Sequence, residues 1–258
     1  MKKWMLCLAG VLSGAMAGCN NDATSPTAGE ATLRMWLTDK TAAYDAVNIT
    51  FTEISAHIDS QWIVLNDQTQ TVNLLDWNNG KTLLLGQAAI EAGTYTQIRL
   101  KIAAAEVVWN GQSYPMDVPS GAQSGLKLLT KFEIAAGSTY DIVLDFDAER
   151  SVVTTGPPQN PKGFKLKPTI RAIAMAFTGS ISGRVANPAA LPVAVAVAGN
   201  DTITASAVDP VSGDFRLAFL PPMAYVVSIA DTLGRAFSKP DAPVNAGQDY
   251  ALGSITLQ

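Results

Sequence analysis

Short alternating segments separated by turn signals most constrain what this chain can form. Apolar side chains alternate with others over 33–37, and the alternation over 94–102 is the cleanest in the chain. A period of two indicates β-strands. Asn110-Gly111, between two such runs, predicts a tight hairpin. Because these segments recur about every 8–12 residues and no helical periodicity is convincing, the chain is predicted to be all-β, built from β-sandwiches.

One strand is expected to be irregular. Apolar residues occupy odd positions over 47–51 and even positions over 54–58. A shift of one residue turns every following side chain to the opposite face unless the strand bulges. We therefore predict a bulge near Thr52-Glu53.

The chain divides into four predicted parts. Residues 1–18 form a signal peptide, 19–30 a flexible tether, 31–177 a first sandwich and 178–258 a second, smaller one. The second sandwich is expected to have strands at 181–185, 193–197, 202–208, 214–219, 225–229 and 254–257. So small a module has a thin core. We expect it to pack on the first domain or on a partner.

The N-terminus predicts where the protein resides. Lys2 and Lys3 precede a short apolar run over 4–11 and then small residues, which is the order of a secretory signal peptide. Met16-Ala17-Gly18-Cys19 resembles the lipobox of bacterial lipoproteins. The resemblance implies that Cys19 is lipidated, which anchors the mature chain in a membrane. Asn20 follows the cysteine, and by the same resemblance the protein is sorted to the outer membrane.

Charge and cysteine content disfavour nucleic acid partners and sites that depend on thiols. The formal net charge is −4, and a mildly acidic surface disfavours a nucleic acid partner. The two cysteines are Cys7, in the predicted signal, and Cys19. The mature chain therefore has no thiol for a disulfide, a thiolate metal site or a nucleophile.

Three carboxylates form the best candidate site. Alternation places Asp145, Asp147 and Glu149 on one face of a strand, and oxygen ligands suit calcium. The alternative is a solvated strand end. A hydrolase with two carboxylates across a cleft would need a partner for them. Asp39, Asp45 or Glu53 are possible partners, and the sequence selects none of them. No other cofactor is expected.

The histidine, the cations and the tryptophans offer weaker sites. His57 is the only histidine, which disfavours a histidine metal site, and it is expected to face solvent. Cations on predicted strands that face outward either form an anion-binding stripe or keep exposed strands from pairing with other chains. They are Arg99, Lys101, Lys127, Lys131, Lys165, Lys167 and Arg171. Four tryptophans either stack on sugars or fill the core: Trp36, Trp62, Trp77 and Trp109.

Five blocks in order carry a resemblance to a known family. They are Leu37-Thr38-Asp39 and the runs 44–54, 92–100, 144–153 and 167–172. Over about 31–176 the chain resembles the bacterial lipoprotein family called domain of unknown function 4382. That family has no established activity, so the resemblance transfers no functional residues.

The last third of the chain resembles a second kind of module. The runs 181–185 and 212–217 and Leu220-Pro221-Pro222 are similar to transthyretin-like, carboxypeptidase-regulatory-type modules over about 179–258. Such modules usually support or present other domains. Tight turns before Tyr95, Tyr140 and Tyr225 resemble the tyrosine corner of Greek-key sandwiches.

The sequence therefore favours a non-enzymatic lipoprotein that binds or scaffolds an envelope protein or glycan. The alternative is a calcium- or carbohydrate-binding adhesion module. A carboxylate-dependent hydrolase is the third possibility, and it lacks a recognisable nucleophile–base pair.

Overall fold

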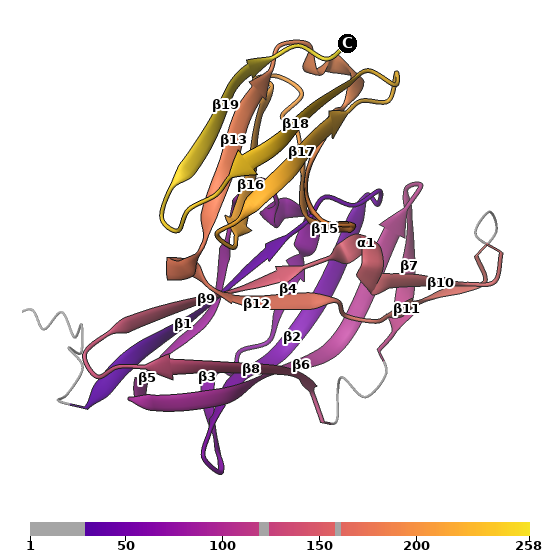
Figure 1. The fold of residues 1–258 in the computed structure, drawn as a ribbon. Coiled ribbons are helices and arrows are strands. Elements are labelled where there is room, and N and C mark those ends of the chain that lie inside the picture. The colour runs from indigo at the N-terminus through magenta and orange to yellow at the C-terminus, as the bar shows by residue number, and fades with distance from the viewer. Residues whose placement is uncertain (1–28, 119–123, 158–160) are drawn as a thin grey trace, which may run out of the picture.

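The computed structural model describes residues 29–118, 124–157 and 161–258. The predicted signal peptide, Cys19 and almost all of the tether lie outside the described residues. The described chain is almost entirely β, with one short α-helix, α1 (Ala148–Ser151), and three 3-10 turns, η1 (Leu74–Trp77), η2 (Met175–Phe177) and η3 (Pro188–Ala190) (Figure 1). None of the described helices is long and apolar enough to cross a membrane. The predicted all-β class is confirmed.

The first domain packs two sheets around one core. The smaller sheet has the order β12 (Ile170–Ala174), β9 (Thr139–Phe146), β1 (Glu30–Asp39) and β5 (Leu83–Glu91). The larger sheet has the order β10 (Val152–Thr155), β11 (Gly163–Leu166), β7 (Gln112–Asp117), β6 (Gly93–Trp109), β2 (Ala46–Ile58) and β3 (Gln61–Asn66). Two further strands extend it, β4 (Gln70–Asn73) on β2 and β8 (Leu126–Ile134) on β6.

The irregular strand and the hairpin are as predicted. The register of β2 against β6 shifts between Thr50 and Glu53, which confirms the bulge near Thr52-Glu53. The bulge lets apolar residues on both sides of it reach the core, because Phe51 and Ile54 are both buried. Asn110 and Gly111 both have positive φ and connect β6 to β7 as a tight turn.

The second domain is a sandwich of a three-stranded and a four-stranded sheet. The first has the order β16 (Asp214–Leu220), β13 (Gly179–Val185) and β19 (Asp249–Ile255). The second has the order β15 (Asp201–Ala207), β14 (Val193–Ala198), β17 (Ala224–Ala230) and β18 (Ala236–Pro243). The sequence analysis missed β18, which contains Pro240 and Pro243. Proline is tolerated there because β18 is an edge strand.

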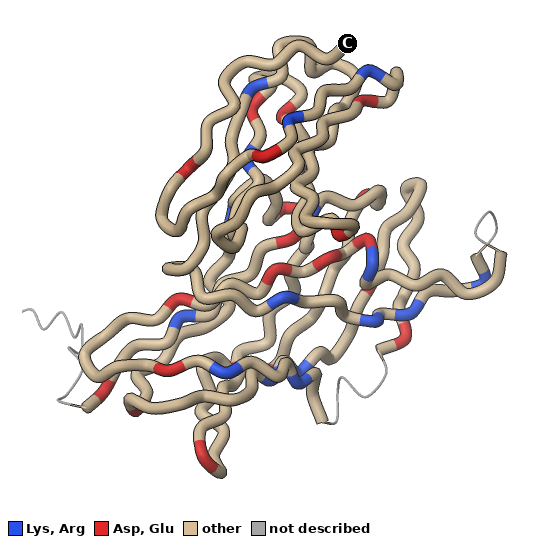
Figure 2. The backbone as a smooth tube through the Cα atoms, in the orientation of Figure 1, with Lys and Arg blue, Asp and Glu red and all other residues tan. Residues whose placement is uncertain are grey.

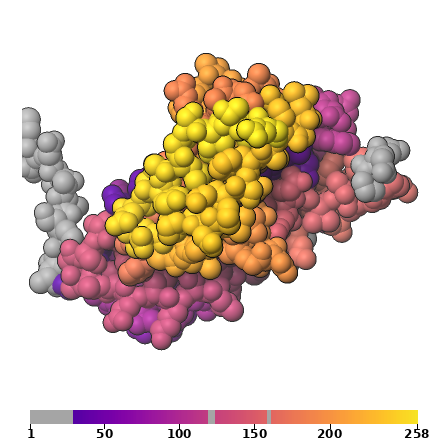
Figure 3. Space-filling model, turned by 45° about the horizontal axis from the view of Figure 1, so that its top comes forward, coloured from indigo at the N-terminus to yellow at the C-terminus, as the bar shows by residue number. Residues whose placement is uncertain are grey.

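The two domains pack against each other. In the space-filling view the second domain, orange to yellow, lies directly over the first, indigo to magenta (Figure 3). The chain passes between them through η2, which follows β12 of the first domain and precedes β13 of the second. Of the two expected packing surfaces for the smaller module, the first domain or a partner, the structure shows the first domain.

Two of the three expected tyrosine corners are present. The Tyr95 hydroxyl donates to the carbonyl of Glu91 at 3.0 Å, and the Tyr225 hydroxyl donates to the carbonyl of Pro221 at 2.8 Å. Both rings are buried. Tyr140 instead stacks on Phe132 with ring centres 5.6 Å apart, and its hydroxyl has no hydrogen bond within the described residues.

This contrast gives a matched test of the corners. Tyr95→Phe leaves the Glu91 carbonyl without its donor, so we expect it to lower the free energy of unfolding by about 1–3 kcal/mol. Tyr140→Phe keeps the stacked ring and removes a hydroxyl without such a bond, so we expect a change within about 0.5 kcal/mol. Urea unfolding of both variants measures the difference, and equal losses would contradict the role of the corner.

Candidate functional site

Two of the three predicted carboxylates, Asp145 and Asp147, lie where the first domain meets the second. The parallel pairing of β9 with β1 places Asp145 opposite Thr38. Strand β9 ends at Phe146, and Asp147 then caps α1 by accepting a hydrogen bond from the backbone N–H of Arg150 at 3.1 Å. The prediction that Asp145, Asp147 and Glu149 share one strand face is therefore wrong. A capping aspartate satisfies a free N–H at the start of the helix and ends the strand there.

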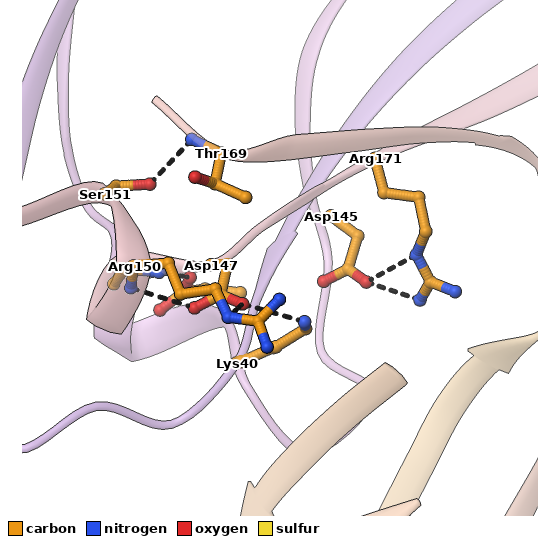
Figure 4. A network of polar contacts seen from close by, with 9 residues as sticks. Lys40, Asp145, Asp147, Arg150, Ser151, Thr169 and Arg171 are labelled. Atoms are coloured by element: carbon orange, nitrogen blue, oxygen red, sulfur yellow. Dashed lines mark hydrogen bonds and ion pairs between the residues drawn. The ribbon is translucent and has the colours of Figure 1, made fainter. Parts of the chain in front are cut away.

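Each of the three carboxylates already has partners, and Figure 4 shows those of Asp145 and Asp147. Asp145 Oδ2 lies 2.5 Å from Nη2 of Arg171, and Asp147 Oδ2 lies 2.9 Å from Nζ of Lys40. Glu149 Oε2 accepts a hydrogen bond from the backbone N–H of Ala43 at 3.1 Å, away from the other two. Asp145 and Asp147 are nearly fully buried, so their expected solvation at a strand end is also wrong.

The partners of these carboxylates compete with calcium for the same oxygens. Within the described ranges, no three His, Cys, Asp or Glu side chains are grouped closely enough to hold a metal ion. A calcium ion at Asp145 and Asp147 would have to displace Arg171 and Lys40. Calcium at this position stays a prediction of the sequence.

The second domain closes one side of the charged network. A pocket of about 280 Å³ is lined by network residues from the first domain, Lys40, Asp145, Asp147, Arg150 and Arg171 among them, and by Asp201, Thr202 and Ile203 from the second. The network has an additional hydrogen bond, because Ser151 Oγ accepts from the backbone N–H of Thr169 at 2.9 Å. The charged residues therefore belong to the junction between the domains.

Asp39 is the unusual member of this region. It is only 4% exposed, and its Oδ1 accepts a hydrogen bond from the backbone N–H of Ala148 at 3.0 Å. Its Oδ2 has no partner within the described residues. It lines a cavity of about 10 Å³ together with Asp145 and residues of the second domain. Burial raises the pKa of Asp39 well above its ordinary value, and the charges of Asp145 and Asp147 add to the effect.

The other two possible carboxylate partners lie elsewhere. Asp45 accepts a hydrogen bond from the backbone N–H of Gly111 at 2.8 Å. Glu53 binds Arg99 at 2.7 Å and Lys101 at 2.6 Å. Of the three candidates, only Asp39 lies beside the predicted cluster, and there burial raises the pKa of Asp39 and of Asp145.

A loop of the first domain fastens the second domain. The strands β15 and β16 are edge strands of the two sheets of the second domain. The side-chain oxygen of Asn79, between η1 and β5, accepts hydrogen bonds from the backbone N–H of Arg216 on β16 and from the hydroxyl of Ser206 on β15. The backbone N–H of Thr41 also donates to the carbonyl of Ala205 at 3.4 Å. The first domain thus covers edge groups that would otherwise remain open.

Six of the seven cations of the predicted basic stripe come from strands of the larger sheet or the segment after one of them, and only Arg171 comes from the smaller sheet. Figure 2 shows where the basic residues lie along the backbone. Arg99, Lys101, Lys127 and Lys131 come from β6 and β8, Lys165 and Lys167 come from β11 and the segment after it, and Arg171 is on β12 of the opposite sheet. The carbon Cζ of Arg99 lies 4.1 Å from the centre of the Trp62 ring. The sequence alone did not separate these groups, because strand order is a long-range property.

His57 and the tryptophans are partly buried. The ring of His57 lies 4.9 Å from that of Trp62, and its Nδ1 is 3.2 Å from the hydroxyl of Thr96. Trp36 donates to Asp141 at 2.7 Å. Trp77 and Trp109 pack against the core of the first domain. The tryptophans thus line both core and surface.

The sequence analysis missed the residues that connect the domains. The turn at Asn78-Asn79-Gly80 is recognisable from its residue types, because asparagine and glycine tolerate positive φ. In the structure Asn79 and Gly80 both have positive φ. Nothing local signals that Asn79 contacts Ser206 and Arg216 more than a hundred residues later.

A family model described as "Domain of unknown function (DUF4382)" matches residues 30–168, which is more than half of the chain. The chain belongs to this family. The match confirms the first resemblance. The matched range ends before the second domain, whose transthyretin-like character rests on the sequence resemblance. A comparison with curated proteins finds no match.

Solved structures give only distant likenesses to this DUF4382 protein. The TIE protein of Bacillus anthracis is 9% identical at a TM-score of 0.24, with 89% of this chain and 34% of that protein covered. BcpA, the major pilin subunit of Bacillus cereus, is 11% identical at 0.21, with coverage of 89% and 70%. A fimbrial protein from Bacteroides ovatus is 8% identical at 0.22, with coverage of 89% and 50%. The chain spans about a third of the Bacillus anthracis protein, and TM-scores this low do not define a shared fold.

The Asn79 contact predicts a specific loosening of the junction. Asn79→Ala removes the acceptor of the Arg216 N–H and the Ser206 hydroxyl. We expect the amide hydrogen of Arg216 to exchange faster and the free energy of unfolding to fall by about 0.5–1.5 kcal/mol for each lost hydrogen bond. Hydrogen exchange followed by mass spectrometry measures the first effect.

Asn110→Ala is the matched control. Asn110 is also an asparagine of positive φ followed by glycine, but it lies in the β6–β7 turn. Both variants therefore carry the same backbone cost of alanine at positive φ. If Asn110→Ala speeds exchange at Arg216 as much as Asn79→Ala does, the Asn79 contact does not hold the junction.

Asp39 predicts an unusual dependence of stability on pH. A carboxyl whose folded-state pKa is raised contributes most to the free energy of unfolding below its unfolded pKa of about 4. That stabilisation is lost as the pH rises through the folded-state pKa. Asp39→Asn keeps an acceptor for Ala148 and removes the ionisable group. We expect the variant to melt at a higher temperature than wild type at pH 7, with the difference shrinking towards pH 3.

Asp141→Asn is expected to change the melting temperature at pH 7 in the opposite direction. Although burial opposes it, hydrogen bonds from Arg34 and Trp36 hold the pKa of Asp141 below its ordinary value. Its stabilisation is present above the unfolded pKa and is lost as the pH falls through the folded pKa. Asp141→Asn should therefore lower the melting temperature at pH 7. A lower melting temperature for Asp39→Asn at pH 7 would contradict the raised pKa of Asp39.

Proposed function

We propose that this protein is a non-enzymatic module of the bacterial cell envelope, anchored through a lipid on Cys19, that binds or scaffolds an envelope protein or glycan. The observation that carries the proposal is the junction. There Asp145 pairs with Arg171 and Asp147 with Lys40 on the first domain, and Asn79 holds the second domain on the first. Such an arrangement keeps two β-sandwiches in a set orientation, which suits a module that presents surfaces to a partner.

The anchor supports the same proposal. The lipobox resemblance ends at Cys19, and a tether of small polar residues separates it from β1, which begins at Glu30. A polar tether lets an anchored domain stand away from the membrane surface. The outer membrane is the proposed location, on the basis of Asn20.

A calcium- or carbohydrate-binding adhesion module is the second candidate. Two observations favour it: Asp39 Oδ2, which has no partner in the part of the chain that the structure describes and lies beside Asp145, and the partly buried Trp62 beside Arg99 on the outer face of the large sheet. A hydrolase finds less support, because Asp45 and Glu53 are bound away from the cluster.

Crosslinking in living cells followed by copurification tests the proposed function. We expect one specific envelope protein or glycan to be captured by wild type and lost with Cys19→Ser, because the unlipidated chain leaves the membrane. Asn79→Ala should reduce the capture if the partner contacts both domains, and Asn110→Ala should not. Equal capture by wild type and Cys19→Ser, or no capture above background by either, would contradict the anchored binding module.

A further inference from the structure

A second site lies in the first domain, away from the charged network. A pocket of about 210 Å³ is lined by Ala43 and Tyr44 from the β1–β2 loop, Trp109 from β6, Glu149 from α1, Thr154 from β10 and Phe164 from β11. We call it the aromatic pocket. Thr154 and Phe164 are cross-strand partners in the β10–β11 pair, so their side chains share a face.

The walls of the aromatic pocket are held in place without a ligand. Next to Tyr44, the backbone N–H of Asp45 donates to the carbonyl of Val108 at 2.9 Å, and the Asp45 side chain accepts from Gly111. On the other side, the Ala43 N–H donates to Glu149. The loop that carries Tyr44 is thus fastened to the β6–β7 turn and to α1. A pocket whose walls are tied in this way is largely preformed.

Three of the six lining residues of the aromatic pocket are aromatic: Tyr44, Trp109 and Phe164. Trp109 and Phe164 meet edge to face with ring centres 6.3 Å apart, and Tyr114 packs behind Phe164 at 5.1 Å. Phe164 is buried, whereas Tyr44 and Trp109 are partly exposed. Aromatic faces carry a negative partial charge that attracts organic cations.

The charge in the aromatic pocket has one sign. Among the described residues that line it, Glu149 is the only charged one, and none is a lysine or arginine. One carboxylate oxygen of Glu149 is engaged by Ala43. Burial raises the pKa of Tyr44, and the charge of Glu149 adds to the effect, so Tyr44 stays a neutral phenol. The next residue, Arg150, is directed to Asp147 rather than to the pocket.

We propose that the aromatic pocket binds a quaternary ammonium group of the kind carried by choline. Three aromatic side chains and one carboxylate suit a cation with an apolar surface. The side-chain oxygens of the lining belong to Glu149, Thr154 and Tyr44. A quaternary ammonium needs no hydrogen-bond acceptor and presents methyl groups to the rings. This inference names a ligand class for the proposed binding module and therefore rests on that function.

Calorimetric titration of the full-length protein with choline tests the proposal. The comparison ligand is 3,3-dimethylbutan-1-ol, which has the shape of choline without its charge. We expect choline to bind at least about tenfold more tightly, since a desolvated cation–π contact is worth a factor of that order. Equal binding of the two compounds, or tighter binding of glucose, would overturn the proposal, and so would the absence of choline binding.

Two variants locate the binding. Tyr44→Leu and Glu149→Gln should each weaken choline binding several-fold, and Glu149→Gln should leave binding of the neutral alcohol unchanged. Phe177→Leu and Glu133→Gln, both at exposed residues, are the matched controls and should bind choline as wild type does. Melting temperatures confirm that all four variants are folded. Loss of binding in the controls, or full binding in Tyr44→Leu and Glu149→Gln, would place the ligand elsewhere.

Two further comparisons identify the source of the ammonium group and distinguish failure of the pocket proposal from failure of the proposed function. Vesicles of phosphatidylcholine, compared with free choline, show whether a lipid headgroup or a small solute is bound. Choline binding without a captured envelope partner would support the aromatic pocket and contradict the scaffold. A captured partner without choline binding would do the reverse.

Discussion

The parallel pairing of β1 with β9 is the contact on which the junction depends. It sets Thr38 opposite Asp145, so the last residues of β1 enter the same space as the end of β9. The hydroxyl of Thr38 lies 2.9 Å from the carbonyl oxygens of Trp77 and Lys81, which border the loop that carries Asn79. One set of backbone hydrogen bonds therefore positions both the buried carboxylates and the loop that reaches the second domain.

The charged residues at this junction favour one arrangement of the strands more than they add to the net free energy of unfolding. Removing a carboxylate from water costs several kcal/mol, and a buried ion pair recovers that cost only with good geometry. Asp145 illustrates the balance, because burial raises its pKa even though Arg171 and Lys40 act in the opposite direction. Removing one partner would leave a buried charge unpaired, so the pairs penalise other arrangements of the strands. At Asp39, burial and the charges of Asp145 and Asp147 raise the pKa, which favours the uncharged form and lowers the same cost.

The sequence predicts what neighbouring residues determine and misses what distant residues determine. The alternation over 94–102, the bulge at Thr52-Glu53 and the Asn110-Gly111 turn follow from local periodicity and backbone preference, and the structure confirms them. The shared strand face of the carboxylates was wrong because a cap at Asp147 overrides alternation. The aromatic pocket was also missed, because its rings come from segments that only the fold brings together.

The β1–β2 loop connects the two candidate sites. Within six residues, Lys40 binds Asp147 in the junction, Thr41 donates to Ala205 of the second domain, and Ala43 and Tyr44 line the aromatic pocket. Asp45 then fastens the end of the loop to the β6–β7 turn. A ligand that restricts Tyr44 therefore restricts a segment that also contacts the second domain. Such a ligand stabilises the contact between domains only to the extent that it binds this loop conformation more tightly than others.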